Sequence, residues 1–410
     1  MPIKSLVVVS SGTGEIQCLS FWKNTLTDYT HFMKKVFVGL SGGVDSAVSA
    51  ALLQEQGYDV TGVFIRAWQP DWLPCTWREE RRDAMKVAIA LGIPFLFLDL
   101  EKEYKQEVVD KMLDEYKKNR TPNPDVLCNR EIKFGHFWKF AKEMGADFIA
   151  TGHYARVAHD STRKNALSSS ADDARSTESG DVFSLQNHVL LESFDKEKDQ
   201  SYFLWTLTKN DLEHVLFPVG DLQKSEVRKL AKKFNLPVAE KKDSQGICFM
   251  GNVSMEEFLS HFIETKSGKV LNTDGEVIGK HKGLVYYTIG ERHGFEVTKK
   301  SATSGPFYVV GKDVKKNILV VSDKESEIVE LSPRKIALTK ASWSQVPDVP
   351  NLTARIRYRG EKLPCKLSLK GKRLMVEFAE PVRGLSLGQS IVFYSDEICL
   401  GGAVMDKIVS

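Results

Sequence analysis

Between residues 33 and 154, short apolar segments alternate with helical segments, and this alternation limits the fold more than any other feature of the chain. The predicted elements are a strand at 36–40, a helix at 45–56, a strand at 60–65, a helix at 79–91, a strand at 94–98, helices at 103–117 and 132–144, and a strand at 148–150. Such alternation indicates a parallel, doubly wound sheet with helices on both faces. In these sheets, ligands bind at the carboxyl ends of the strands, where the loops after Leu40, Ile65 and Ala150 converge.

The rest of the chain predicts two further regions. Residues 216–282 have a mainly helical pattern, and residues 283–410 contain short apolar segments between Gly, Pro and charged turns. The strands predicted in the second region are 284–289, 307–310, 318–321, 354–358, 365–369, 374–378 and 391–394. Short strands at near-regular spacing are typical of a small antiparallel barrel. The predicted fold class is α/β: a doubly wound parallel domain at 33–215, a small mainly helical central domain at 216–282 and a C-terminal antiparallel β-barrel at 283–410.

Two segments fall outside this pattern. Residues 160–180 are polar, rich in Ser and Asp and aperiodic, which predicts a mobile surface insertion. Residues 1–32 lack the basic start and long apolar core of a secretory signal. Because Met33 leads directly into the first predicted strand, the upstream segment is either a dispensable extension or the product of a misassigned initiation site.

Composition excludes several classes of protein. Hydrophobic residues make up 42% of the 410 residues, too many for a largely disordered chain. No segment approaches the run of about 18 apolar residues that a membrane span needs. The formal net charge is only +3, so affinity for nucleic acid has to come from local basic surface. The six cysteines form no Cys-x-x-Cys pair, which favours a reducing, cytoplasmic compartment.

The segment Ser41-Gly-Gly-Val-Asp-Ser46 lies between a predicted strand and a predicted helix. Its two glycines allow a tight turn with accessible backbone amides, and the start of the helix adds positive potential. The loop therefore suits an anion such as pyrophosphate, but it lacks the Gly-Lys-Ser/Thr of a Walker A motif. It resembles the PP-loop of ATP pyrophosphatases, which cleave ATP between the α and β phosphates and leave AMP on a substrate oxygen.

Two later segments each contain a cysteine in a setting that favours access or reactivity. Thr121-Pro-Asn-Pro-Asp-Val-Leu-Cys-Asn129 is a proline-rich loop that reaches Cys128, and Lys241-Lys-Asp-Ser-Gln-Gly-Ile-Cys-Phe249 places Cys248 near two lysines that favour the thiolate. A single cysteine is more often a small buried apolar residue. The two cysteines are 120 positions apart (248 minus 128), so only folding can bring them together.

With these motifs, the chain resembles the MnmA family of tRNA-specific 2-thiouridylases. The matching segments, which span Met33 to the C-terminus, are Gly39-Leu-Ser-Gly-Gly-Val-Asp-Ser46, Thr121 to Asn129, Ala150-Thr-Gly-His-Tyr-Ala-Arg156, Lys198-Asp-Gln-Ser-Tyr-Phe203, Lys242-Asp-Ser-Gln-Gly-Ile-Cys-Phe249, Tyr287-Thr-Ile-Gly-Glu-Arg292 and Gly388-Gln-Ser-Ile-Val-Phe-Tyr394.

The resemblance implies an ATP site in the PP-loop domain at 33–215, with Mg²⁺ accompanying the ATP. The residues implied in ATP binding are Gly39, Leu40, Ser41, Gly42, Gly43, Val44, Asp45, Ser46, Ile65 and Gly152. Ile65 stands where many relatives have methionine, a tolerable exchange for an apolar wall.

The resemblance also implies the reaction. The target is the wobble uridine 34 of certain tRNAs, approached by Asn123, Pro124 and Asp125 after it leaves the anticodon stack. ATP would adenylate its C2 oxygen. Sulfur would arrive as a persulfide on Cys248, donated by a cysteine desulfurase or a sulfur-relay protein, and give 2-thiouridine, AMP and pyrophosphate.

Cys128 is implied as the second catalytic cysteine. It would either attack the persulfide to free hydrosulfide or help to expel AMP, and end in a catalytic disulfide with Cys248. Asp125 is a candidate for proton transfer or, equally, a residue that caps a turn.

Further residues match tRNA-contacting positions of the family: His153, Lys198, Asp199, Gln200, Arg357, Tyr358 and Gln389. The central domain would carry a basic cluster of Lys224, Arg228, Lys229, Lys232 and Lys233. Such a charge run is by default a solvated helix face, but a tRNA substrate favours a phosphate-binding surface. No role is assigned to Cys75, and Cys18, Cys365 and Cys399 are most simply structural.

Two other functions remain open at this point. An AMP-forming ligase that acts on a small metabolite would keep the PP-loop but would not need Cys128 and Cys248. A tRNA-binding or sulfur-carrier protein without ATP chemistry would have no use for the loop at 41–46.

Overall fold

The computed structural model describes residues 7–10, 33–159, 188–242, 253–299, 305–347, 351–371 and 373–409. The chain divides into two compact units that are each assembled from separate segments. Unit 1 comprises Met1–Lys105, Asn129–Gln200 and Asn210–Phe249, and unit 2 comprises Gln106–Cys128, Ser201–Lys209 and Met250–Ser410.

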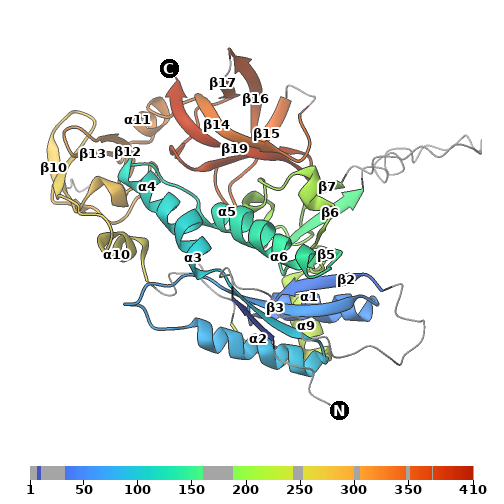
Figure 1. Cartoon of the computed structure of the whole chain (residues 1–410). Coiled ribbons are helices and arrows are strands. Elements are labelled where there is room, and N and C mark those ends of the chain that lie inside the picture. Colours follow the sequence, from blue (N-terminus) through green and yellow to red (C-terminus); the bar gives the residue numbers. More distant parts are fainter. Residues whose placement is uncertain are drawn as a thin grey trace, which may run out of the picture. The chain divides into compact units, whose positions relative to one another are not determined.

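Unit 1 contains a parallel sheet, as the sequence predicts (Figure 1). Its strands, in spatial order, are β1 (Val7–Ser10), β4 (Phe95–Asp99), β3 (Asp59–Arg66), β2 (Lys35–Gly39), β5 (Phe148–Ala150) and β8 (Val215–Leu216). The sheet has six strands, two more than predicted: β8, and β1 from the segment 1–32 that was expected to lie outside the fold pattern. Since β2 lies between β3 and β5, the strand order reverses beside β2. This position is where open parallel sheets bind ligands.

Helices cover both faces of the sheet because successive residues of β2 point in opposite directions. Val36 and Val38 share a buried cluster with α1 (Val44–Glu55), α2 (Trp77–Leu91) and α9 (Lys224–Lys233). On the opposite face, the rings of Phe37 and Phe140 in α6 (Phe137–Glu143) are 6.3 Å apart. The doubly wound prediction is confirmed.

The helix predicted at 103–117 is divided into three parts: α3 (Glu101–Tyr104), a π-helical segment η1 (Lys105–Asp110) and α4 (Lys111–Lys117). Strands β6 (Ala155–His159) and β7 (His188–Glu192) form an antiparallel hairpin in unit 1. The mobile insertion predicted at 160–180 lies outside the described residues.

Unit 2 contains a five-stranded sheet that the sequence analysis did not recognise. Its strands, in spatial order, are β11 (Glu296–Val297), β10 (Val277–His281), β9 (Gly268–Leu271), β13 (Ile318–Ser322) and β12 (Tyr308–Asp313). Its core contains Val270, Leu319 and Val321, all fully buried. The sheet crosses the domain boundary expected at residue 282, and it takes up two strands that had been expected in the barrel.

The strand predicted at 284–289 is wrong. Residues Leu284–Tyr286 form a 3₁₀ turn, η4, in which Leu284 and Val285 are both buried. Neighbouring residues of a strand point to opposite faces, so a turn of helix buries such a pair more readily. The short helix α10 (Met255–Ser260) lies beside this turn.

The C-terminal part of unit 2 is a closed six-stranded antiparallel barrel, which confirms the predicted architecture (Figure 1). Its strands, in spatial order, are β14 (Lys335–Trp343), β17 (Arg373–Phe378), β16 (Leu363–Lys370), β15 (Asn351–Arg355), β18 (Ser390–Ser395) and β19 (Ile398–Val409). Pairing of β14 with β19 closes the barrel. Within the described ranges, no helix is long and apolar enough to cross a membrane.

Candidate functional site

The loop between β2 and α1 is held in shape by the hydroxyls of its two serines. The backbone N–H of Ser41 donates to Oγ of Ser46 at 3.2 Å, and this Oγ donates to the Gly43 carbonyl at 3.1 Å. Gly42 has φ +73°, and a Cβ added there would lie 2.4 Å from the Glu80 carbonyl oxygen. This left-handed conformation and the close approach both require glycine.

The helix that follows the loop is open at its N-terminus. Gly43 is the N-cap of α1, and no side chain caps the helix. Gly152, beyond the end of β5, passes so close that an added Cβ would lie 2.6 Å from the Ser46 backbone nitrogen. Uncapped N–H groups at the positive end of a helix suit a phosphate. The loop and the Gly152 segment therefore fit the pyrophosphate part of ATP.

Asp45, in the first turn of α1, is bonded by two side chains from distant parts of the chain. Lys224 Nζ lies 2.7 Å from Oδ1 and 2.9 Å from Oδ2, and the Tyr154 hydroxyl donates to Oδ1 at 2.9 Å. The backbone N–H of Lys224 donates to the buried Asp195 at 2.9 Å. A fixed lysine therefore lies at the loop, 179 positions from Asp45, where the sequence alone gives no signal for it.

A second lysine, Lys241, bonds the loop itself. Its Nζ donates to the Gly42 carbonyl at 3.0 Å and to Asp83 Oδ2 at 2.9 Å. Burial raises the pKa of the neighbouring Glu80, with Asp83 adding to the rise and Lys241 opposing it. Lys241 thus fastens the loop to α2.

Within the described ranges, no group of three or more His, Cys, Asp or Glu residues is arranged to hold a metal ion.

The basic cluster on α9 mostly has partners within unit 1. Lys224 bonds Asp45, and the Arg228 guanidinium donates to the carbonyls of Ala239 and Lys241. Lys232 and Lys233 form ion pairs at the surface with Glu240 at 2.9 Å and Glu55 at 3.5 Å. The helix packs on α1, so Lys224 bonds the first turn of α1 beside the loop at 41–46, and Arg228 bonds the chain at 239–241. They do not form the open phosphate-binding surface that the sequence predicted.

His153 is a buried residue of unit 1. Its Nδ1 lies 2.7 Å from the Thr151 hydroxyl and its Nε2 lies 3.4 Å from Lys133 Nζ. Because an ammonium group only donates, Nε2 is the acceptor and Nδ1 carries the proton. Burial, together with Lys133, lowers the pKa of His153 well below its usual range. The ring is therefore neutral at pH 7.

The other expected tRNA-contacting residues of unit 1 support Tyr154 and its surroundings. Gln200 accepts the Tyr154 N–H at 2.9 Å and donates its own N–H to the Tyr154 carbonyl at 2.8 Å. The buried Asp199 accepts the Ser193 N–H at 3.1 Å. The backbone N–H of Lys198 donates to Asp195 at 3.3 Å.

The segment from Thr121 to Asn129, called the cysteine loop below, belongs to unit 2 up to Cys128. Asn123 is the N-cap of α5 (Pro124–Leu127), where it accepts the Val126 N–H at 3.4 Å, and Pro124 occupies the first helical position. Cys128 is 5% exposed and opens a π-helical segment, η2 (Cys128–His136), while Asp125 is half-buried. Such departures from α geometry are frequent at functional sites. Cys248 lies outside the described residues, as does Cys18.

The three barrel residues in the prediction have different surroundings within unit 2. Arg357 is exposed, and the Tyr358 ring lies 4.6 Å from the Phe203 ring and 5.1 Å from the Arg359 guanidinium. Gln389 instead points to the cysteine loop, where its Nε2 donates to the carbonyls of Thr121 and Pro122. Of the predicted site residues in unit 2, Gln389 contacts the segment that begins at Thr121, while Arg357 and Tyr358 have other surroundings.

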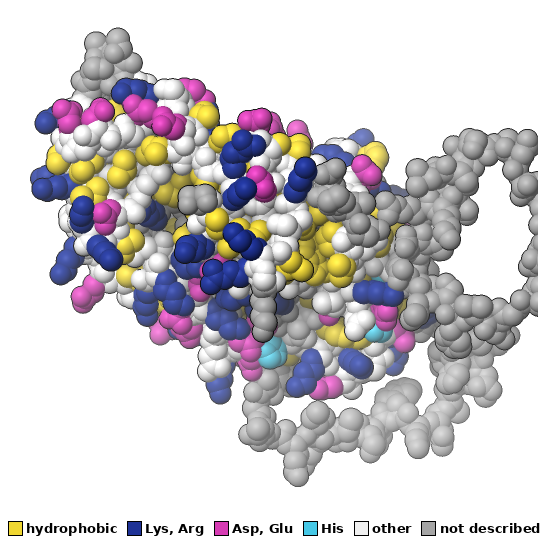
Figure 2. Space-filling view, turned by 90° about the horizontal axis from the view of Figure 1, so that it is seen from above, with side chains coloured by type: hydrophobic (Ala, Val, Ile, Leu, Met, Phe, Trp, Pro, Cys, Tyr) yellow, Lys and Arg dark blue, Asp and Glu magenta, His cyan; other side chains and the backbone are white. Residues whose placement is uncertain are grey.

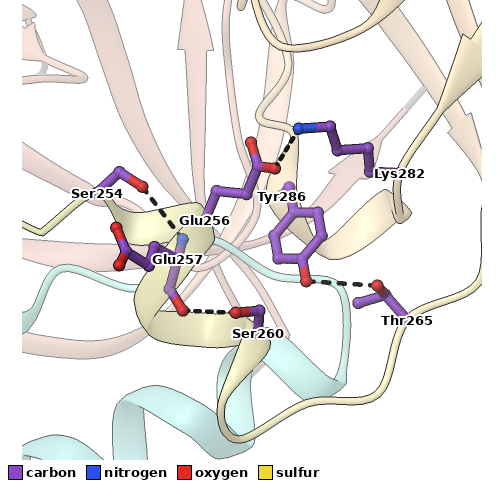
Figure 3. A pocket seen from close by; sticks show the side chains of 7 residues that line it. All are labelled: Ser254, Glu256, Glu257, Ser260, Thr265, Lys282 and Tyr286. Atoms are coloured by element: carbon purple, nitrogen blue, oxygen red, sulfur yellow. Dashed lines mark hydrogen bonds and ion pairs between the residues drawn. The ribbon is translucent and has the colours of Figure 1, made fainter. Parts of the chain in front are cut away.

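A shallow pocket lies elsewhere in unit 2, between α10 and η4 (Figure 3). Lys282 Nζ lies 2.8 Å from Glu256, and the hydroxyls of Thr265 and Tyr286 are 3.3 Å apart. These side chains bond one another across the pocket, and none of the predicted site residues lines it.

Comparison with known proteins gives one consistent result. Three family models cover most of the chain: a tRNA methyl transferase HUP domain at residues 34–252, a tRNA methyl transferase PRC-barrel domain at 256–323 and an aminomethyltransferase beta-barrel domain at 333–405. The tRNA-specific 2-thiouridylase MnmA of Staphylococcus epidermidis is 41% identical over 91% of this chain and 95% of its own length. The chain belongs to the MnmA family of tRNA-specific 2-thiouridylases.

Another MnmA relative, from Listeria monocytogenes, is 42% identical over 91% of this chain and 95% of its own length. Among solved structures, the U34-tRNA thiolase NcsA of Methanococcus maripaludis is 21% identical and has a TM-score of 0.31 over 56% of this chain and 63% of that chain. This likeness is too weak to support an argument. The HUP domain match at residues 34–252 contains the loop at 41–46, Gly152, Lys224 and Lys241.

Proposed function

We propose that this MnmA-family protein is an ATP-dependent tRNA 2-sulfurtransferase that converts the wobble uridine 34 to 2-thiouridine, with AMP and pyrophosphate as the other products. The observation that supports this most directly is the open N-terminus of α1. Gly43 leaves it without a side-chain cap, and Gly152 approaches it too closely for any side chain. A helix start of this kind is built for phosphate, as an adenylation reaction requires.

ATP would bind with its phosphates at the backbone amides of residues 41–46, beside Gly152 and the side chain of Ile65. Mg²⁺ would accompany ATP and neutralise phosphate charge, and Asp45 is the carboxylate placed at this loop. Lys224 would compensate the charge of Asp45, and Lys241 would hold Gly42 in place.

In the first step, the C2 oxygen of uridine attacks the α-phosphorus of ATP, and pyrophosphate leaves. Asn123, Pro124 and Asp125 would contact the base, and Asp125 is the candidate for proton transfer. Adenylation turns the C2 oxygen into a good leaving group, since it then departs with AMP.

In the second step, the outer sulfur of a Cys248 persulfide replaces that oxygen. In one route, the Cys128 thiolate attacks the inner sulfur, hydrosulfide is released to attack C2, and a Cys128–Cys248 disulfide remains. In the other route, the persulfide attacks C2 directly, AMP leaves, and Cys128 then releases the thiolated base and forms the same disulfide. A cysteine desulfurase or sulfur-relay protein would reload Cys248 after the disulfide is reduced.

The tRNA would extend beyond the base to both units. We propose contacts with His153, Lys198, Asp199 and Gln200 in unit 1, and with Arg357, Tyr358 and Gln389 in unit 2. Figure 2 shows Lys and Arg side chains interspersed with Asp and Glu on one face of the molecule. With a net charge of +3, binding would depend on local contacts, and we expect the protein to act in the cytoplasm, where its tRNA substrate is.

The decisive experiment incubates the protein with unmodified tRNA, ATP, Mg²⁺ and either sulfide or a desulfurase with cysteine. Nucleoside mass analysis then measures 2-thiouridine at position 34. Cleavage of ATP to AMP and pyrophosphate without 2-thiouridine would indicate another acceptor. Absence of both products would favour a binding or sulfur-carrier protein.

Cys128→Ala and Cys248→Ala should each abolish thiolation and leave tRNA binding nearly intact, because the thiols act on sulfur and not on tRNA affinity. Cys75→Ala, which removes an exposed cysteine, is the matched control and should thiolate normally. If either of the first two variants keeps its activity in the desulfurase assay, the role proposed for that cysteine is wrong.

A further inference from the structure

Thr121, at the start of the cysteine loop, uses its N–H, its carbonyl and its hydroxyl in hydrogen bonds within unit 2. Its N–H donates to the Leu387 carbonyl at 2.8 Å, and its carbonyl accepts from Gln389 Nε2 at 3.0 Å. Its hydroxyl lies 3.2 Å from the hydroxyl of Thr288. All three polar groups of one loop residue are therefore used by two segments that are far away in the sequence.

The next residues of the loop are held from the same side. Gln389 Nε2 also lies 3.4 Å from the Pro122 carbonyl. Tyr202 hydrogen-bonds the Asn123 side chain and donates its hydroxyl to the Ser390 carbonyl at 2.9 Å. Residues 387–390 thus hold residues 121–123 in three ways. The Leu387 carbonyl accepts the Thr121 N–H, the Gln389 side chain bonds the carbonyls of Thr121 and Pro122, and Tyr202 bonds both Asn123 and Ser390.

Close packing adds to these bonds. Gly388 has φ +94°, and a Cβ added there would lie 3.0 Å from the backbone nitrogen and oxygen of Thr121. The barrel and the cysteine loop can come this close together because residue 388 has no side chain.

Thr288 belongs to the segment Tyr287-Thr-Ile-Gly-Glu-Arg292, to which no role has been assigned so far. The Thr288 N–H donates to Glu291 Oε2 at 2.9 Å, and the Glu291 N–H donates to the Thr288 carbonyl at 3.1 Å. The neighbouring Gly290 N–H donates to the Val309 carbonyl at 2.8 Å, which ties this turn to β12. The Thr288 hydroxyl is therefore presented to the loop by a fixed turn.

We propose that Thr288 and Gln389 are positioning residues that fasten the loop at 121–123 and so fix Cys128 for sulfur transfer. This inference rests on the proposed function. The Gln389 Nε2 lies 3.0 and 3.4 Å from the two loop carbonyls, so Gln389 acts on the reaction through the loop as well as through the tRNA contact proposed above.

The test uses Thr288→Val and Gln389→Glu in the full-length protein. The first removes a hydroxyl at nearly constant shape, and the second places a carboxylate oxygen against two carbonyl oxygens. The readout is the alkylation rate of Cys128 by iodoacetamide without ATP or tRNA, followed by mass analysis of its peptide. Loss of one hydrogen bond makes local opening roughly fivefold more frequent, so we expect alkylation of the buried Cys128 to be about fivefold faster.

Two controls separate this role from general destabilisation. Thr353→Val removes a barrel hydroxyl that bonds the Tyr394 carbonyl, away from the loop, and should leave the Cys128 rate unchanged. Thr288→Ser keeps the hydroxyl and should restore the slow rate.

Enzymatic assays complete the test. For Thr288→Val, kcat for thiolation should fall while the Kd for tRNA is unchanged. For Gln389→Glu, kcat for thiolation should fall by more than any change in the Kd for tRNA explains. Unchanged alkylation of Cys128, or a loss confined to tRNA affinity, would overturn the proposal. Because alkylation needs no substrate, this readout decides the matter even if the proposed activity is absent.

Discussion

Gly152 shows how the absence of one side chain shapes the candidate ATP site. It passes the first turn of α1, where a Cβ would meet the Ser46 backbone nitrogen at 2.6 Å, whereas a Cβ on Gly39 would make only ordinary contacts from 3.6 Å outward. The loop at 41–46 could be predicted because a strand, a glycine-rich turn and a helix are local features, whereas Gly39 and Gly152 were implied only by the family resemblance. The resemblance gave no means of telling which of the two glycines is sterically required.

We therefore expect Gly152→Ala to weaken ATP binding and Gly39→Ala to bind ATP normally. A forced displacement of this kind costs about 1–3 kcal/mol, which corresponds to roughly 5- to 150-fold in ATP affinity. Titration of ATP by calorimetry measures the difference. Equal affinities of the two variants would contradict the proposed position of the phosphates.

The buried His153 leads to a prediction about pH. Burial and Lys133 lower its pKa, so the folded protein holds the ring neutral while an unfolded histidine protonates near pH 6.5. The stability is complete above pH 6.5 and falls as the pH drops below it, by about 1.4 kcal/mol per unit until the folded pKa is reached. The NMR signal of His153 should stay that of the neutral ring at pH 6. A titration midpoint of 6.5 or higher would show that the burial argument fails.

At the scale of elements, α9 has a different role from the one its composition predicts. Five basic residues in ten positions indicate a solvated or RNA-binding face, and the contact between Lys224 and Asp45 appears only when the chain folds. The strand predicted at 284–289 failed for a similar reason, because packing decided between two structures that the local pattern permits. The sequence analysis missed strands β14 and β19, which close the barrel. Both are long and partly exposed, and regularly spaced turn residues do not delimit them in the sequence.

Lys224→Met should lower ATP affinity, while Lys229→Met on the same helix should not. Loss of Lys224 leaves the Asp45 carboxylate uncompensated where the phosphates bind, and bonds to charged groups contribute about 1.5–3 kcal/mol. Lys229 is exposed and serves as the matched control.

Asp45→Ala should block adenylation, which is followed as release of pyrophosphate. Normal release by this variant, or equal ATP affinity of the two lysine variants, would argue against the site.

At the scale of the whole molecule, the predicted functional residues are divided between two units. The residues proposed to bind ATP lie in unit 1, whereas Asn123, Cys128 and Gln389 lie in unit 2. The sequence predicted the α/β domain and the barrel correctly, because each has a continuous pattern. It could not predict that residues 106–128 leave the α/β unit to join the barrel unit, since only contacts between distant segments determine this.

Removal of residues 1–32 should leave ATP binding and thiolation unchanged, because the predicted site begins at Gly39. It should also increase aggregation, since β1 pairs with β4 from Val7↔Leu96 to Ser10↔Asp99 and its loss leaves the edge of β4 unpaired. Light scattering at increasing protein concentration tests this, with the full chain as the reference. A truncated protein that has lost ATP binding would assign the segment a larger role.

The fastening of Thr121 by Gln389 also has a consequence for biosynthesis. The two residues are 268 positions apart. At a synthesis rate of ~5–20 residues per second, the ribosome adds this length in roughly 15–50 s. During that time the nascent chain carries Cys128 on a loop that its barrel does not yet hold, although most of unit 1 has emerged. The nascent protein should therefore acquire its ability to bind ATP before its ability to transfer sulfur to tRNA.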